Sequence, residues 1–163
     1  NKIINNAIAN FKPLAHRLEF AGEYRGIKFY NDSLSTIQES AVAAIEGLGD
    51  NLQTLIAGGF ERHQPFDKLA EKILDSNIKT IILFLPTGKR IWQAIKNVDH
   101  KKSKNLKINH YFVKTMEEAV NLAFAKTQKG KICLLSAASA SFGGFRDYAD
   151  RGDSFKKYIR RRK

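Results

Sequence analysis

Short apolar runs along the chain alternate with stretches in which apolar residues recur at helical spacing. Near the start, the runs at residues 18–24 and 27–31 flank Arg25-Gly26, and this pattern predicts a β-hairpin. Four further strands are predicted where apolar residues cluster, at residues 52–57, 78–85, 108–113 and 131–136. The run at 78–85 is almost continuously apolar, which is typical of a strand covered on both faces.

Helices are predicted between and after these strands, because apolar residues there recur every three or four positions. The helical stretches cover residues 37–48, 65–74, 91–95, 115–129 and 155–159. Two of them begin with a capping-box pattern, Thr36 with Glu39 and Thr115 with Glu118. Regular alternation of strands and helices predicts an α/β fold, a single doubly wound and mostly parallel sheet with helices on both faces, preceded by the short hairpin.

The remaining features of the chain bound its class. Residues 3–11 show helical spacing, which Pro13 stops, and they lack both a starting Met and a signal-peptide pattern, so we expect an excised fragment. No apolar run approaches the ~20 residues that a membrane-spanning helix needs. Cys133 is the single cysteine and lies in an apolar run, which excludes an intrachain disulfide and predicts a buried, inert thiol. Together these features predict a cytoplasmic protein without membrane contact.

The formal net charge of +12 is the strongest compositional signal. It suits nucleic acid, but it suits nucleotide phosphates and small acidic substrates equally well. Much of the excess lies in residues 101–104 and 160–163, and such runs are usually solvated loops and helix ends. No known nucleic-acid-binding motif accompanies the charge, so we expect no nucleic-acid partner.

Ligands of parallel sheets bind beyond the C-terminal ends of the strands, which directs attention to residues 31–36, 58–63, 86–90 and 137–148. Gly88-Lys89 is not the end of a Walker A loop, because Leu83 and Arg90 occupy the positions where that motif needs Gly and Ser or Thr. We interpret it as a turn with a solvated lysine. The four histidines have no metal-ligand spacing, so no metal site is expected. Arg151-Gly152-Asp153 is interpreted as a helix start with Asp153 as its first-turn acid.

The other three loops favour an anionic ligand without requiring one. Residues 31–36 place hydroxyl and backbone N–H groups where a helix begins, which suits a phosphate or carboxylate, or simply a well-capped helix. Gly58-Gly59 permits close backbone approach, and Arg62 can bind a carboxylate or phosphate. The small residues of 137–145 indicate close approach of a ligand or tight packing.

These segments, in this order and spacing, resemble the C-terminal domain of Mur ligases, specifically of those that add glutamate to UDP-N-acetylmuramoyl-L-alanine in peptidoglycan synthesis. Each motif alone is weak, whereas the ordered set is specific and covers essentially the whole chain. The matching stretches are His16-Arg17-Leu18-Glu19, Asn31-Asp32-Ser33-x-x-Thr36, Gly58-Gly59-x-Glu61-Arg62, Leu134-Leu135-Ser136-x-Ala138-x-Ala140-Ser141-Phe142-x-x-Phe145 and Arg151-Gly152-Asp153-x-Phe155.

The resemblance implies that ATP phosphorylates the carboxylate of UDP-N-acetylmuramoyl-L-alanine and that the glutamate amine then attacks the acyl phosphate. It also implies that preceding domains hold the UDP group, the phosphate-binding loop and the Mg²⁺ ligands. Residues 1–14 would then end a linker helix, and residues 15–163 would form the C-terminal domain, which is inactive alone and carries no assigned catalytic residue or metal site. The implied nucleotide contacts are Arg17, Asp32 and Ser33. The implied glutamate contacts are Thr36, Arg62, Ser141, Phe142 and Tyr148.

This chain departs from the common form of the family at three positions, with Leu34 and Arg62 in place of Lys and Tyr148 in place of Phe. D-Glutamate is the expected substrate, but these changes leave its stereochemistry open. Two alternatives remain. One is a ligase domain of the folylpolyglutamate synthase type, whose usual Gly-Ala-His-Asn is not matched by Ser33-Leu34-Ser35-Thr36. The other is a stand-alone module that binds nucleotides or acidic ligands.

Overall fold

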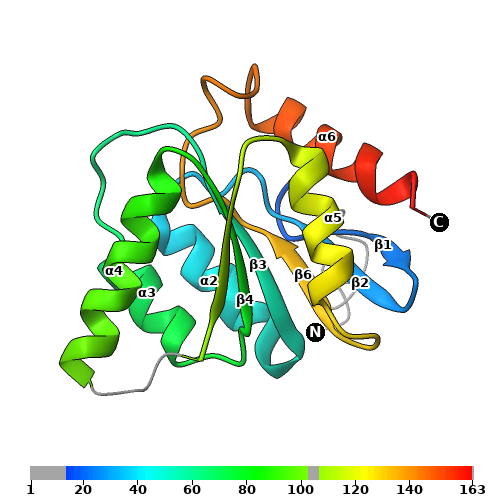
Figure 1. The fold of residues 1–163 in the computed structure, drawn as a ribbon. Coiled ribbons are helices and arrows are strands. Elements are labelled where there is room, and N and C mark those ends of the chain that lie inside the picture. The colour runs from blue at the N-terminus through cyan, green and yellow to red at the C-terminus, as the bar shows by residue number, and fades with distance from the viewer. Residues whose placement is uncertain (1–13, 103–106, 163) are drawn as a thin grey trace, which may run out of the picture.

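The structure, a computed structural model, describes residues 14–102 and 107–162, and the predicted helix at residues 3–11 lies outside them. A six-stranded sheet with the order β1-β2-β6-β3-β4-β5 forms the centre (Figure 1). Its strands are β1 (Glu19–Tyr24), β2 (Ile27–Asn31), β3 (Leu52–Gly58), β4 (Thr80–Phe84), β5 (Asn109–Val113) and β6 (Ile132–Leu135). All neighbouring pairs are parallel except β1 and β2, so the predicted α/β fold class is confirmed.

The hairpin at the start of the sheet is also confirmed. Arg25 and Gly26 have φ angles of 55° and 78°, and two consecutive positive values give a tight turn whose twist matches that of the strands. Glycine tolerates this conformation without steric penalty, which explains its position in the turn.

Helices cover both faces of the sheet (Figure 1). One face packs against α2 (Gln38–Leu48), α3 (Asp67–Leu74) and α4 (Thr87–Lys102), and the other against α5 (Met116–Lys126) and α6 (Tyr148–Arg160). A short 3₁₀ helix, η1 (Gly49–Asn51), leads into β3. Every residue of β3, β4 and β6 is buried, and for β4 the almost continuous apolar run at 78–85 predicted this burial. Cys133 is buried among them, and burial raises the pKa of its thiol.

The position of the last strand decides which loops meet. Strand β6 lies between β2 and β3, so the loop that follows it is placed between the loops that follow those two strands. Three segments far apart in the sequence therefore share the carboxyl edge of the sheet. Among the described residues, no helix is both long and apolar enough to cross a bilayer.

Two predicted helix starts are wrong. The Thr36 and Glu39 capping box does not form, because the chain stays extended through Ile37 and α2 begins at Gln38 without a side-chain cap. Helix α6 begins at Tyr148 with Asp147 as its N-cap, so Asp153 lies in the second turn rather than the first. The capping box of Thr115 and Glu118 is confirmed at the start of α5.

Candidate functional site at the carboxyl edge of the sheet

The loops after β2, β3 and β6 are joined directly at the carboxyl edge. Gly58 donates its backbone N–H to the carbonyl of Ala137 at 2.7 Å, and Phe60 donates to that of Ala140 at 2.8 Å. The hydroxyl of Thr87, the first residue of α4, accepts a bond from the backbone of Gly59 at 2.7 Å and lies 3.0 Å from the Ser139 hydroxyl. This edge is therefore a connected structure, in which loops from four strands have fixed relative positions.

Arg151 crosses this edge from α6 and is only 1% exposed. Its Nε and Nη2 atoms donate to the hydroxyl and carbonyl oxygens of Ser33 at 2.9 and 2.8 Å, and Nη1 donates to the Ser139 carbonyl at 2.9 Å. Burial lowers the pKa of Arg151 to about 10, so the guanidinium stays charged at neutral pH. Within the described residues, neutral oxygens rather than a carboxylate hold this cation. A buried guanidinium is favourable only while all of its hydrogen bonds are in place. Arg151 therefore requires the loops of Ser33 and Ser139 in these positions, and its hydrogen bonds hold the two loops there.

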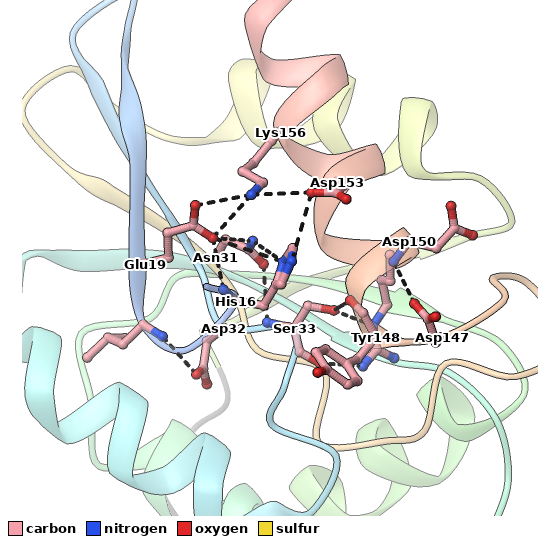
Figure 2. A network of polar contacts seen from close by, with 12 residues as sticks. His16, Glu19, Asn31, Asp32, Ser33, Asp147, Tyr148, Asp150, Asp153 and Lys156 are labelled. Carbon is pink, nitrogen blue, oxygen red and sulfur yellow. Dashed lines mark hydrogen bonds and ion pairs between the residues drawn. The ribbon is translucent and has the colours of Figure 1, made fainter. Parts of the chain in front are cut away.

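A second polar cluster, shown in Figure 2, joins residues 16–19 to α6. Asn31 Nδ2 donates to His16 Nδ1 at 3.0 Å and to Glu19 Oε2 at 3.0 Å. Lys156 Nζ lies 3.1 Å from Glu19 Oε1 and 3.3 Å from Asp153 Oδ1. The motifs at residues 16–19 and 151–153 are thus in contact, although about 130 residues separate them along the chain.

Gly152 explains why that contact is so close. A Cβ atom at position 152 would overlap the His16 ring and the Asn31 amide, so the helix can approach only where no side chain is present. Burial raises the pKa of Glu19, but bonds from the His16 backbone and from Lys156 lower it by more, and the pKa lies below its usual range. The cluster therefore holds an ionised Glu19 at neutral pH.

The three expected nucleotide contacts differ in accessibility. Asp32 is buried, with Oδ1 accepting the Leu18 backbone N–H at 3.1 Å and Oδ2 accepting the Ser136 hydroxyl at 2.7 Å. The Ser33 hydroxyl donates to the Tyr148 carbonyl at 2.7 Å and accepts from Arg151. Arg17 is exposed and lines, together with Asp32, an open pocket of about 470 Å³ beside α2. Arg17 is therefore the one of the three that is free to move toward a ligand.

Three of the expected glutamate contacts lie together. The guanidinium of Arg62 is 5.5 Å from the centre of the Phe142 ring, and Phe142 is 49% exposed. Ser141 and Phe142 line a pocket of about 250 Å³ with largely apolar walls. The structure thus places an exposed cation and a buried hydroxyl close to one concave surface.

The other two lie at a distance from that pocket within the described part of the chain. The Gln64 side-chain amide donates to the carbonyls of Thr36 and Ala138, so it joins the loop of Thr36 to the loop after β6. Tyr148 begins α6, and its ring lies against His16, with centroids 6.0 Å apart. Neither Thr36 nor Tyr148 is therefore among the residues that line this pocket.

Sequence reasoning missed two charged groups at this edge. Lys114 lines the pocket, and its position directly after β5 follows the same rule that selected the other loops. Arg90 Nη1 lies 2.5 Å from Glu61 Oε1. The two residues are far apart in the sequence, so no local sequence pattern predicts this ion pair. Lys89 is solvent-exposed, as predicted. No three His, Cys, Asp or Glu side chains among the described residues are grouped so that they could hold a metal ion.

Comparison with known proteins agrees with the order of the motifs. The family described as "Mur ligase, glutamate ligase domain" matches residues 16–139. The chain is 36% identical over 156 residues to the UDP-N-acetylmuramoylalanine--D-glutamate ligase of Caldicellulosiruptor bescii, which covers 96% of this chain and 32% of that protein. It is 36% identical over 157 residues to the same enzyme of Thermoanaerobacter sp., covering 96% and 33%. The chain thus spans about a third of the length of these relatives.

Solved structures show the same fold at low sequence identity. The MurF ligase of Thermotoga maritima in complex with ADP aligns with a TM-score of 0.58 and 16% identity, over 95% of this chain and 34% of that one. E. coli FolC in complex with ADP aligns with a TM-score of 0.57 and 13% identity, over 91% and 32%. These structures show the fold alone, and the fold does not by itself separate the peptidoglycan expectation from the folate alternative.

Proposed function

This chain belongs to the Mur ligase family, whose glutamate ligase domain it matches, and we propose that its parent protein joins D-glutamate to UDP-N-acetylmuramoyl-L-alanine in peptidoglycan synthesis. The observation that carries the proposal is 36% identity, along 96% of this chain, to enzymes named for that reaction. The substrates ATP and a UDP-linked acceptor are soluble, so the reaction is assigned to the cytoplasm.

In the proposed reaction, the acceptor carboxylate attacks the γ-phosphorus of ATP, giving an acyl phosphate and ADP. The glutamate amine then attacks the acyl carbon and loses a proton, and inorganic phosphate leaves as the amide forms. Preceding domains of the same protein supply the UDP site, the phosphate-binding loop and the ligands of Mg²⁺, which would neutralise charge on the phosphates. The present domain contributes the amino-acid site and part of the nucleotide site.

We assign the glutamate site to the region around Arg62. Glutamate carries two carboxylates, and Arg62 is an exposed cation that can form two parallel hydrogen bonds to one of them. The remaining expected contacts are the hydroxyls of Ser141 and Thr36 and the rings of Phe142 and Tyr148, and the Phe142 ring also lies against the Arg62 guanidinium. Lys114 lines the same pocket and adds a second positive charge, which favours an anionic substrate.

The nucleotide contacts are assigned to the pocket beside α2. Arg17 is the side chain expected to reach ATP. Asp32 would act indirectly, because it accepts the backbone N–H of Leu18, the residue after Arg17. Ser33 would hold the loop in place through its hydrogen bond with Arg151. The bond from Leu18 to Asp32 thus fixes the backbone next to Arg17 at the edge of this pocket.

The test is product formation by the full-length protein with ATP, Mg²⁺ and each acceptor in turn. We expect an amide product from UDP-N-acetylmuramoyl-L-alanine and D-glutamate. The kcat/KM for L-glutamate should be lower by about tenfold or more, because its carboxylate would be misplaced in the site. Turnover with a folate acceptor and not with the UDP-linked one would favour the folate type of ligase. ATP binding without any product would favour a binding module and contradict the proposal.

A further inference from the structure

Arg90, in the first turn of α4, lies across the loop that carries Arg62. Its Nη1 atom donates to Glu61 Oε1 at 2.5 Å, and its Nη2 atom donates to the Gln64 carbonyl at 2.9 Å. The guanidinium also lies 5.3 Å from the centre of the Phe66 ring. One side chain from a neighbouring element thus contacts the loop on both sides of Arg62.

The loop depends on such contacts because it has little internal structure. Residues 61–65, all of them described, take part in no backbone-to-backbone hydrogen bond, and side chains hold them instead. Besides the bonds from Arg90, the Gln64 amide binds the Thr36 and Ala138 carbonyls, and Glu61 accepts from the His63 backbone. The position of Arg62 is therefore set by its neighbours in the loop and by Arg90.

The same contact removes an electrostatic problem. Glu61 directly precedes Arg62, and a free carboxylate there would compete with an acidic substrate for the Arg62 guanidinium. Burial raises the pKa of Glu61, but the His63 backbone bond and the nearby charge of Arg90 lower it by more. The pKa of Glu61 therefore lies below its usual range, and the ionised carboxylate needs a partner. Among the described residues, Arg62 contacts the Phe142 ring and pairs with no carboxylate, which leaves its donors available.

We propose that Arg90 is a positioning residue for amino-acid binding: it pairs with Glu61 and anchors the loop, and so keeps Arg62 available for a carboxylate of the incoming amino acid. The inference rests on the proposed function, which assigns that carboxylate to Arg62. It also gives a role to the segment at residues 86–90, which sequence patterns predicted to be only a turn with a solvated lysine.

The experiment compares steady-state ligation by the full-length protein and its variants, with glutamate and ATP varied separately. Arg90→Ala should raise the glutamate KM by about two- to fivefold, the range expected when an exposed charge pair is lost and its carboxylate turns to a competing site. The ATP KM and kcat should stay unchanged. Lys89→Ala is the matched control, because it removes one positive charge from the same helical turn and should leave the glutamate KM at the wild-type value.

Two double variants distinguish positioning from direct contact. In Glu61→Gln/Arg90→Ala the competing carboxylate is absent, so the glutamate KM should return toward the wild-type value. In Arg62→Ala/Arg90→Ala the loss should equal that of Arg62→Ala alone, since Arg90 acts through Arg62. If Arg90→Ala does not fold, Arg90→Gln carries the same expectations.

An unchanged glutamate KM in Arg90→Ala, or a loss matched by Lys89→Ala, would overturn the inference. So would a loss that persists without Glu61 and adds to that of Arg62→Ala, because Arg90 would then contact the substrate itself. If Arg62→Ala raises KM and Arg90→Ala does not, only this inference fails. If Arg62→Ala has no effect, the assignment of Arg62 in the proposed function fails, and this inference fails with it.

Discussion

Replacing Arg151 should destabilise the domain strongly, although the residue lies outside the hydrophobic clusters. In Arg151→Met the apolar stem is largely kept, but the Ser33 and Ser139 carbonyls lose a charged donor in a buried setting. Three hydrogen bonds to a charged group contribute about 1.5–3 kcal/mol each, and desolvation of the buried guanidinium offsets several kcal/mol of that gain. A net loss of about 2–4 kcal/mol remains, which for a domain of this size lowers Tm by roughly 5–15 °C.

The assay is thermal and urea denaturation of this chain, followed by circular dichroism. Arg151→Lys should lose most of the same stability, because a single ammonium group cannot reach acceptors on two loops in the way that a guanidinium can. Arg146→Ala is the control, since Arg146 is exposed and pairs with Asp150 only at 3.6 Å, and it should stay within about 0.5 kcal/mol of the wild type. A fully stable Arg151→Met protein would show that the buried cation contributes nothing to holding the loops together.

Three further outcomes are expected. Asp32→Ala should destabilise the chain by about 1–3 kcal/mol in urea denaturation, because the Leu18 N–H and the Ser136 hydroxyl lose their acceptor; an unchanged Tm with a raised ATP KM in the full-length protein would instead show a direct nucleotide contact. Glu19→Gln should be less stable than the wild type at pH 7, and the difference in stability should shrink as the pH falls below about 4.5. The reason is that a carboxyl whose pKa is lowered by folding stabilises the folded state only while it is ionised. A stability difference that does not change with pH in melting experiments would contradict this. The chain alone, given ATP, Mg²⁺ and both substrates, should release no phosphate above the blank, because the phosphate-binding loop is expected on a preceding domain; steady phosphate release would contradict that assignment.

Local patterns predicted the strands and their burial well. The apolar run at 78–85 became the fully buried β4, and Arg25-Gly26 became the turn of the hairpin. Both features follow from a short stretch of sequence, because a continuous apolar run predicts burial and a residue pair such as Arg25-Gly26 predicts the backbone conformation of a turn. The loops that follow the strands were identified for the same reason, because the end of a strand marks the edge of the sheet.

Contacts between loops could not be predicted in this way. The pairing of Arg151 with Ser33 and Ser139 arises because β6 lies between β2 and β3, and periodicity does not reveal strand order. The capping box at Thr36 failed for a related reason: the loop after β2 is held by distant partners, including the His16 carbonyl bound by Leu34, and α2 begins only after the chain has left them. Within the candidate site, sequence similarity selected Arg62, Ser141 and Phe142, which the fold brings together, but it did not reveal Arg90 or Lys114.

Binding of the amino acid at the carboxyl edge around Arg62 is tested most directly by the glutamate dependence of ligation by full-length Arg62→Ala. A charge-assisted bond to a carboxylate contributes about 1.5–3 kcal/mol, so the apparent glutamate affinity should fall by about ten- to a hundredfold while the ATP dependence stays the same. Arg62→Lys should recover part of that loss if two parallel hydrogen bonds matter. Unchanged glutamate kinetics in a normally folded Arg62→Ala protein would exclude Arg62 from the amino-acid site and leave it as a solvated cation on a basic surface.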